Sequence, residues 1–338
     1  MDDATGWIRK EHGPMTTPQQ KRFRALDLFA GGGGSTYGAV TAGVDVVAAI
    51  DAWELACTTY EDNNPEVHVY HKTCEELDPA RIRKEVGEID LILASPECTN
   101  HTCAKGKGKR SEASRNTAFQ VSRYAAVLKP RWIIVENVIQ MRAWRRYDEL
   151  VGELESIGYH VTPHVFNAAD FGVPQSRRRL FLVCQMESPP PAIEPPNLDR
   201  KSAKDIIDKN GTYRFSPLWD ERRAVPTLER AERAIAELGE HQPFLLVYYG
   251  SDGAGGWQKI GAPLRTITTL DRFAYVKLKD GEHQMRMLQV PELQLAMGFP
   301  PEYKLAQGSR RDRIKLLGNA VCPPVLCHII KTLLASSR

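Results

Sequence analysis

The sequence predicts an α/β protein with a doubly wound parallel sheet, and three observations lead to this fold class. Five short apolar runs have the length and composition of buried strands, and helical patterns separate most of them. A cluster of glycines follows the first run directly, at a place where such folds bind ligands. The predicted strands are residues 24–30, 44–51, 89–94, 131–135 and 179–184.

Helices are expected between and after these strands. Residues 117–128 and 145–157 have helical patterns, and the C-terminal stretch 320–337 has the character of a helix that packs back on the sheet. The proline-rich segment 187–196 marks a boundary. After it, the regular alternation of predicted strands and helices stops, and only a charged helix is expected, near residues 228–238. This change indicates a smaller, irregular domain inserted before the chain returns to the main sheet.

These patterns divide the chain into four parts. We expect a disordered N-terminal tail at residues 1–22, the main domain at 23–187, the smaller domain at 188–300 and a C-terminal return to the main domain at 301–338.

The composition is typical of a globular enzyme. Of 338 residues, 42% are hydrophobic and 26% are charged, and no run of about 18 apolar residues predicts a membrane span. Seven cysteines without close regular spacing favour a reducing cytoplasm over a disulfide framework. The net charge of +3 means that any binding of nucleic acid must come from local basic patches.

The glycine loop narrows the choice of ligand. Gly33 and Gly38 have the spacing of a phosphate-binding loop, but Ala39 stands where that loop needs a lysine, and no dinucleotide fingerprint fits. Asp51 ends the second predicted strand, 24 residues after Asp27, and is suited to accept hydrogen bonds from a ribose. The pattern favours a nucleoside ligand such as S-adenosylmethionine, with other nucleotides next.

A cysteine stands where the third predicted strand gives way to a basic loop. The stretch 91–110 reads LILASPECTNHTCAKGKGKR, with Cys98 at the mouth of the apolar run. A structural cysteine is expected inside such a run, whereas a cysteine at its mouth is a better candidate for a nucleophile.

Six stretches, in order, resemble one family. They are DLFAGGGGSTYGAVTAG, SPEC, ENV, NAADFGVPQSRRRLFLV, RMLQVPELQLAMGFP and GNAVCPP. In this order they are similar to the motifs of the cytosine-C5 DNA methyltransferases, from about residue 24 to the C-terminus. The resemblance implies the Rossmann-like fold of class I S-adenosylmethionine-dependent methyltransferases. It makes residues 23–187 the catalytic and cofactor-binding domain and residues 188–300 the target-recognition domain.

The resemblance assigns roles to individual residues. Cys98 would add to carbon 6 of cytosine, and Glu136 would act as the acid at ring nitrogen 3. Arg179 would stabilise the carbonyl edge of the base, and Arg177 would position a backbone or phosphate group. The implied cofactor contacts are Phe29, Gly31, Gly33, Asp51, Trp53, Asp90, Glu97, Asn319 and Val321. The implied DNA contacts are Lys105, Lys107, Lys109, Arg110, Gln175, Thr268 and Thr269.

The implied partner is double-stranded DNA, from which the target cytosine is flipped into the pocket. A cognate restriction endonuclease is a further implied partner, and we expect a monomer. We expect no metal, because Cys98 and Cys103, and Cys322 with Cys327 and His328, lack the paired short spacing of a zinc site.

The sequence departs from the family pattern next to the nucleophile. Glu97 and Thr99 flank Cys98 where relatives carry proline and glutamine, and Ala52 follows Asp51 where relatives often carry an aromatic residue. A carboxylate at Glu97 predicts slow or altered chemistry. Two alternatives therefore stay open: a tRNA cytosine-C5 methyltransferase, and a slow, altered or inactive DNA-binding homologue. An amino-group methyltransferase fits poorly, since that reaction needs no thiolate.

Overall fold

The structure is a computed structural model that describes residues 22–97, 116–249, 253 and 255–337. The predicted nucleophile Cys98 and the predicted phosphate contacts Lys105, Lys107, Lys109 and Arg110 lie outside the described residues. Nearly all of the predicted tail also lies outside them.

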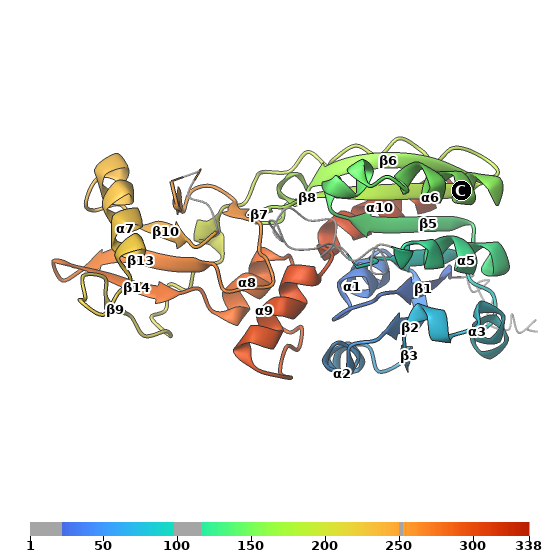
Figure 1. Ribbon diagram of the computed structural model, residues 1–338, viewed down its shortest axis with the longest axis horizontal. Helices are drawn as coiled ribbons and strands as arrows, with labels where there is room; N and C mark the ends of the chain where they lie inside the picture. Colours follow the sequence, from blue (N-terminus) through green and yellow to red (C-terminus); the bar gives the residue numbers. More distant parts are fainter. Residues whose placement is uncertain (1–21, 98–115, 250–252, 254, 338) are drawn as a thin grey trace, which may run out of the picture.

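A seven-stranded sheet forms the centre of the larger part of the molecule, with the strand order β3-β2-β1-β4-β5-β8-β6 (Figure 1). Its strands are β1 (Arg24–Leu28), β2 (Asp45–Asp51), β3 (His68–His71), β4 (Leu91–Ala94), β5 (Trp132–Asn137), β6 (Tyr159–Asn167) and β8 (Arg178–Met186). The strands β1 to β5 pair in parallel, and β8 pairs antiparallel with both β5 and β6. The α/β fold class and the mainly parallel sheet are confirmed.

Three features of this sheet differ from the expectation. The strand predicted at residues 179–184 is β8, which runs antiparallel, because only a short connection separates it from β6 and no crossover helix intervenes. Strand β6 was missed, since its sequence YHVTPHVFN mixes polar residues and a proline into a half-exposed strand. Strand β3 was missed as well, because HVYH is short and lies at the sheet edge.

Helices cover both faces of the sheet. Neighbouring strand residues point to opposite faces, so Ala25 belongs to one core cluster and Leu26 to the other. On the first face, α1 (Gly34–Thr41) packs against α10 (Pro323–Ala335). The second face is covered by α3 (Pro79–Val86), α5 (Phe119–Leu128) and α6 (Tyr147–Ser156), and α2 (Glu54–Asn63) lies beside β2 and β3.

The order of the strands creates a crevice for a ligand. The chain moves outward from β1 through β2 to β3, and then returns to continue from β4 on the other side of β1. In such sheets ligands bind beyond the carboxyl ends of the strands at this switch point. The glycine loop follows β1 there, and the segment leading to Cys98 follows β4.

A second, five-stranded antiparallel sheet lies at the other end of the molecule (Figure 1). Its order is β11 (Trp257–Lys259), β10 (Phe244–Val247), β13 (Phe273–Lys279), β14 (Glu282–Met287) and β9 (Ser216–Pro217). Helix α7 (Val225–Leu238) packs on it around a cluster of its own that includes Phe244 and Leu246. This region is smaller, as expected, but more regular than the irregular domain that the sequence suggested.

Short elements join the two sheets. Strand β7 (Gln175–Ser176) pairs in parallel with β12 (Leu264–Arg265), and helices α8 (Val290–Ala296) and α9 (Arg310–Asn319) lie between the sheets (Figure 1). The remaining elements are the 3₁₀ turns η1 (Cys74–Glu76), η3 (Ile139–Ala143), η4 (Ala168–Phe171) and η5 (Ala203–Asp205).

The stretch Arg310–Ala335 has the length and mean hydropathy of a membrane span, but 67% of its apolar window is buried inside the protein. It consists of two helices, α9 and α10, rather than one. Packing against α1 and the sheet accounts for its apolar character.

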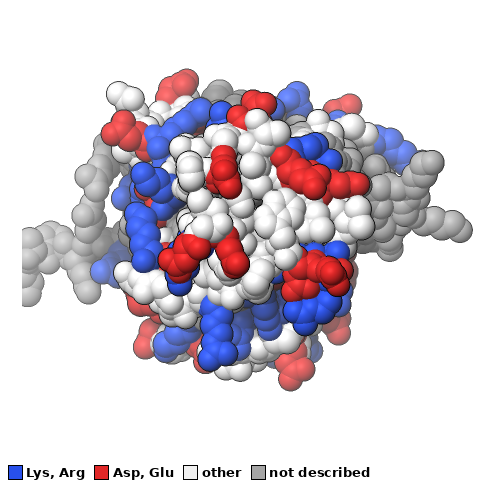
Figure 2. Space-filling view, turned by 90° about the vertical axis from the view of Figure 1, so that its left-hand side faces the viewer, with Lys and Arg blue, Asp and Glu red and all other residues white. Residues whose placement is uncertain are grey.

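The end of the molecule formed by the smaller sheet and α7 carries charges of both signs. Figure 2 shows Lys and Arg gathered along one margin and at the bottom of this end, with Asp and Glu scattered among uncharged residues. This end of the molecule is therefore not a continuous basic surface of the kind that tracks DNA phosphates.

Candidate active site

The loop after β1 is built around unusual backbone conformations. Phe29 has φ +58°, which is strained for a bulky residue, and its carbonyl accepts a 2.9 Å hydrogen bond from Ser95 Oγ. Gly33 has φ +88°, and a Cβ there would lie 2.6 Å from Tyr303 Oη. The loop thus needs glycine for both its conformation and its packing.

Asp51 holds this loop in place. Its Oδ2 accepts a 2.8 Å hydrogen bond from Gly31 N, and its Oδ1 accepts one of 2.8 Å from Trp53 N. Burial raises the pKa of the Asp51 carboxyl, and these backbone hydrogen bonds oppose the rise. The carboxylate therefore ties the glycine loop to the start of α2, a role that sequence spacing did not indicate.

The residues beside the loop suit a nucleoside cofactor. Gly31 has φ +53° and a Cβ there would meet no atom within 4 Å, so the chain turns beside open space. Trp53 is half-buried, with Lys315 Nζ 4.1 Å from the centre of its ring. These residues fit S-adenosylmethionine, with the Asp51 carboxylate and the Trp53 ring at the end of β2, where ribose and adenine are expected.

The other predicted cofactor residues fall into three groups. Val321 is buried, and a Cβ on Gly34 would lie 2.5 Å from its carbonyl oxygen, so the C-terminal motif packs directly on the glycine loop. Asn319 is exposed at the end of α9, and Glu97 is exposed after β4. Asp90, the last of these residues, does not lie where the sequence analysis expected it.

Asp90 lies at the wrong end of the sheet for cofactor contact. It precedes β4, and its Oδ2 accepts a 2.9 Å hydrogen bond from Arg24 N at the start of β1. The crevice lies beyond the opposite, carboxyl ends of these strands. Asp90 instead anchors the first residue of β1.

Glu136 and Arg179 form an ion pair at the ends of neighbouring strands. Arg179 Nε lies 3.1 Å from Glu136 Oε1, and their side chains are only 15% and 10% exposed. Glu136 pairs across the sheet with Phe181, so Arg179, two residues away on the same face, is its diagonal neighbour. Burial raises the pKa of Glu136, and Arg179 and then Arg177 oppose the rise.

Glu136 lies beside the segment that leads to Cys98. Ala94 pairs with Val135, which brings the residues after β4 and β5 to the same edge. Asn137 Nδ2 donates a 3.1 Å hydrogen bond to the carbonyl of Pro96, two residues before Cys98. The structure therefore brings Glu136 and Arg179 together next to the predicted nucleophile's position in the chain.

Arg177 connects three segments. Its Nη1 donates to the carbonyl of Ile267 at 3.0 Å, and its Nη2 donates to the carbonyls of Gly318 and Ala320 at 2.9 and 3.0 Å. The side chain is only 3% exposed. The sequence analysis expected Arg177 to position a backbone group or a phosphate. In the structure it binds backbone carbonyls of the protein.

The position of Gln175 also differs from the expectation. We expected it to contact DNA, but its side chain is fully buried. Its Oε1 accepts a hydrogen bond from Ile267 N at 2.9 Å, and its Nε2 donates to Ala296 O at 3.0 Å. Gln175 and Arg177 therefore hold both backbone groups of Ile267.

Thr268 and Thr269 follow Ile267 and are half-buried. A Cβ on Gly318 would lie 2.4 Å from the carbonyl carbon of Thr268 and 2.7 Å from Thr269 N. The predicted DNA contacts of the smaller domain thus lie against the C-terminal motif.

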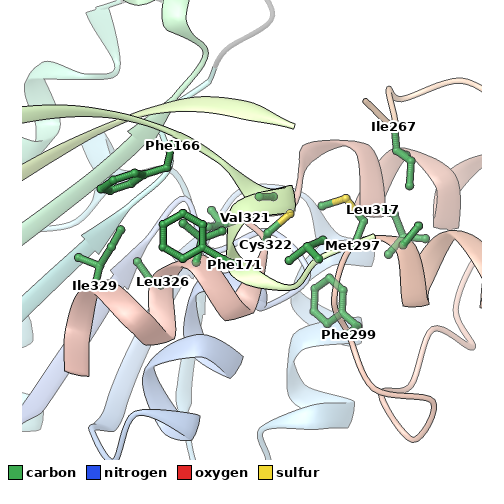
Figure 3. Packing of buried hydrophobic residues seen from close by; sticks show 14 of the residues in the cluster. Phe166, Phe171, Ile267, Met297, Phe299, Leu317, Val321, Cys322, Leu326 and Ile329 are labelled. Atoms are coloured by element: carbon green, nitrogen blue, oxygen red, sulfur yellow. The ribbon is translucent and has the colours of Figure 1, made fainter. Parts of the chain in front are cut away.

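Cys322 is a neighbour of the Glu136–Arg179 ion pair that the sequence analysis did not identify. It lines a small cavity together with Glu136, Arg177 and Arg179. Burial raises the pKa of its thiol to about 11, so it is uncharged at neutral pH. Figure 3 shows Val321 and Cys322 within the buried cluster, between Phe166 on one side and Leu317 on the other. Only its place after the GNAV motif could have signalled this position.

Comparison with known proteins agrees with this arrangement. The family model described as C-5 cytosine-specific DNA methylase matches residues 23–335. The chain belongs to this family. As a member it is an S-adenosylmethionine-dependent methyltransferase, and the family resemblance expected from the motifs is confirmed.

Curated relatives are named Type II methyltransferases. The chain is 27% identical over 315 residues to M.HgiDI of Herpetosiphon aurantiacus, an alignment that covers 88% of this chain and 90% of that protein. It is 29% identical over 309 residues to M.HindV of Haemophilus influenzae, covering 88% and 92%. The match to M.DdeI of Desulfomicrobium norvegicum is 33% identical over 165 residues, or 47% of this chain and 39% of that protein.

Solved structures share the fold of this methylase. A DNMT2 mutant of Spodoptera frugiperda has a TM-score of 0.68 at 20% identity, covering 92% of this chain and 99% of that one. Dnmt2 of S. pombe has a TM-score of 0.65 at 18% identity, covering 94% and 100%. Within the described part of the chain, no group of three His, Cys, Asp or Glu residues could hold a metal ion.

Proposed function

We propose that this methylase transfers a methyl group from S-adenosylmethionine to carbon 5 of a cytosine flipped out of duplex DNA, through a covalent Cys98 adduct at carbon 6. The observation that carries this proposal is the buried Glu136–Arg179 pair at the end of β5, directly beside the strand that leads to Cys98.

The reaction requires a nucleophile because carbon 5 lies in an aromatic ring and reacts poorly with methyl donors. Addition of the Cys98 thiolate to carbon 6 breaks the conjugation and makes carbon 5 enamine-like. The cofactor supplies an electrophilic methyl group. A base then removes the proton from carbon 5, and elimination releases Cys98.

Glu136 supplies the acid for this addition. Negative charge develops toward ring nitrogen 3 as the thiolate adds, and a protonated carboxyl can donate to it. Burial keeps the pKa of Glu136 above its ordinary value, which favours the protonated form that the role needs. Arg179, beside it, is suited to bind the carbonyl oxygen of the base.

Arg177 acts by positioning. It joins the carbonyl of Ile267 to those of Gly318 and Ala320, so the DNA side and the cofactor side of the site share one buried guanidinium. We assign the smaller domain, residues 188–300, to reading the target sequence, and the lysine-rich stretch after Cys98 to phosphate contacts.

Glu97 sets the rate in this proposal. It replaces the proline of relatives and is exposed three residues after the end of β4. A carboxylate near the donor's sulfonium stabilises a positive charge that is lost in the reaction, which slows turnover. Glu97→Pro should raise turnover, and an unchanged rate and cofactor affinity would contradict this role.

The proposed setting is the cytoplasm of a cell that carries a restriction-modification system, where the monomer protects sites cut by a cognate endonuclease. The Type II names of the relatives support this setting.

Trapping tests the proposed mechanism. In the presence of S-adenosylmethionine, duplex DNA containing 5-fluorocytosine should form an adduct with the wild-type protein that resists denaturation. After methyl transfer, carbon 5 carries fluorine instead of a removable proton, so the elimination that would release Cys98 is blocked. Cys98→Ala should form none, whereas Cys103→Ala, a second cysteine in the same stretch, should behave as wild type. A wild-type protein that forms no adduct would contradict the covalent mechanism.

A further inference from the structure

An exposed leucine stands at the bend between β12 and β13. Leu270 is 40% exposed and directly follows Thr268 and Thr269. A single exposed leucine is common on protein surfaces and indicates nothing by itself. The surroundings of Leu270 are what set it apart.

The backbone on the N-terminal side of Leu270 is held firmly. Both backbone groups of Ile267 are bound, the N–H by Gln175 and the carbonyl by Arg177. Thr268 packs against Gly318 without room for a Cβ between them.

The C-terminal side is held as well. Asp271 Oδ2 accepts hydrogen bonds of 3.0 and 2.7 Å from Arg310. The next residue, Arg272, bonds to Tyr248 through both its backbone carbonyl, at 2.8 Å, and its guanidinium, at 2.5 Å. An apolar side chain is thus presented to solvent on a bend that is fastened at both ends.

This bend is close to the catalytic pair. Leu270 follows Ile267 by three residues, a distance of at most about 10 Å along the chain. Ile267 is bonded to Arg177, which lines the same small cavity as Glu136 and Arg179. None of the other exposed large apolar side chains among the described residues lies on a helix, strand or bend that carries a predicted site residue. These side chains are Val40, Val127, Leu198, Trp219 and Val225.

We propose that Leu270 is an apolar wedge that enters the DNA base stack beside the target cytosine and stabilises the flipped-out state. Extruding a base leaves a gap whose apolar faces are exposed to water, and proteins that unstack DNA often insert a leucine or a similar side chain. A wedge must be rigid to resist closure of the stack, and the anchored bend supplies that rigidity. The inference rests on the proposed function and adds to it the residue that offsets the cost of flipping.

A pair of substrates tests the wedge. Bisulfite sequencing of DNA treated with wild-type protein first identifies the target site. One duplex then carries that site with its normal guanine opposite the target cytosine. The second duplex has an abasic site in place of that guanine, which lowers the cost of extrusion. Single-turnover methylation is measured for wild type, Leu270→Ala and Leu270→Met, with Val127→Ala as a control at an exposed apolar residue on α5, outside the smaller domain.

If Leu270 is a wedge, the methylation rate lost in Leu270→Ala should depend on which duplex is the substrate. Leu270→Ala should be slowed about tenfold or more on the paired duplex, which corresponds to roughly 1.4 kcal/mol or more, and should come within about twofold of wild type on the abasic duplex, as expected when unstacking is the step affected. Leu270→Met, which keeps the apolar volume, and Val127→Ala should resemble wild type on both.

Two results would overturn the wedge alone: a Leu270→Ala rate equal to wild type on the paired duplex, or equal losses on both duplexes. The second result holds against it even if the variant is less stable, since instability lowers both rates alike. A wild-type protein inactive on both duplexes would instead overturn the proposed function.

Discussion

Arg179 Nε lies 3.1 Å from Glu136 Oε1, and the two side chains belong to antiparallel neighbours β8 and β5. Burial raises the pKa of Glu136, while the Arg179 charge acts in the opposite direction. In the proposed mechanism, the pair therefore adjusts how much of Glu136 carries the proton that the addition step needs.

Arg179→Gln should reduce methylation and shift its pH dependence. Loss of a charged hydrogen bond to the base should slow the rate by roughly 10- to 100-fold. With the arginine gone, the pKa of Glu136 rises further, so the protonated acid persists to higher pH. The alkaline fall in single-turnover rate should move to higher pH. Arg178→Gln, at the exposed neighbouring position, should leave the profile unchanged, and an unshifted profile in Arg179→Gln would contradict the coupling.

Asp51→Asn should weaken cofactor binding. The carboxylate accepts from two backbone N–H groups, at Gly31 and Trp53, and an amide can accept only through one oxygen. One buried donor loses its partner, which costs about 1–3 kcal/mol. Calorimetry should show an S-adenosylmethionine affinity reduced by tenfold or more. Glu54→Gln, exposed on α2, should bind normally; equal affinity in both variants would refute the role of Asp51.

Gly318→Ala and Gly152→Ala should change stability in opposite directions. A Cβ on Gly318 would lie 2.4 Å from the backbone of Thr268, so the turn must shift, at a cost of about 1–3 kcal/mol. Gly152 lies in α6 with no atom within 4 Å of a Cβ, so alanine should stabilise the helix by about 0.5–1 kcal/mol. Urea unfolding measures both. Methylation should fall only in Gly318→Ala, because only that change displaces Thr268.

Asp27 should make stability depend on pH. It is fully buried behind the glycine loop, its Oδ2 accepts a 2.8 Å hydrogen bond from Thr36, and burial raises its pKa to about 7. Between about pH 4 and 7 the folded protein holds a proton that the unfolded chain has lost. The contribution of Asp27 is therefore full below about pH 4 and is lost as pH rises through about 7.

Asp27→Asn removes this titration. The unfolding free energy of wild type relative to Asp27→Asn should fall by up to about 1.4 kcal/mol per pH unit between pH 5 and 7. The control is Asp205→Asn: hydrogen bonds from Ser202 lower the pKa of Asp205, so its contribution is constant in this range. A difference between wild type and Asp27→Asn that does not change with pH would disprove the assignment.

Sequence reasoning succeeded where a motif is local. The glycine loop follows β1 as predicted, and Glu136 and the segment before Cys98 end adjacent parallel strands, as alternation of strands and helices implies. It failed where contacts between residues far apart in the sequence determine the role of a side chain. Asp90 stands next to a strand, but only the direction of that strand shows that it faces away from the crevice.

The same limit explains the other misses. Gln175 lies in a polar run that suggests a surface, yet the backbone of Ile267, 92 residues later, binds its side chain. Cys322 is about 185 residues from Glu136 in the chain, and apart from its place after the GNAV motif nothing in the sequence signals that the two line one cavity.

The central claim is tested most directly by identifying the product. Duplex DNA is incubated with isotopically labelled S-adenosylmethionine and either wild type or Cys98→Ala, digested to nucleosides and analysed by mass. Labelled 5-methylcytosine from wild type alone is the predicted result. An unmodified cytosine with wild type, a different mass on it, or equal 5-methylcytosine from Cys98→Ala would contradict the account.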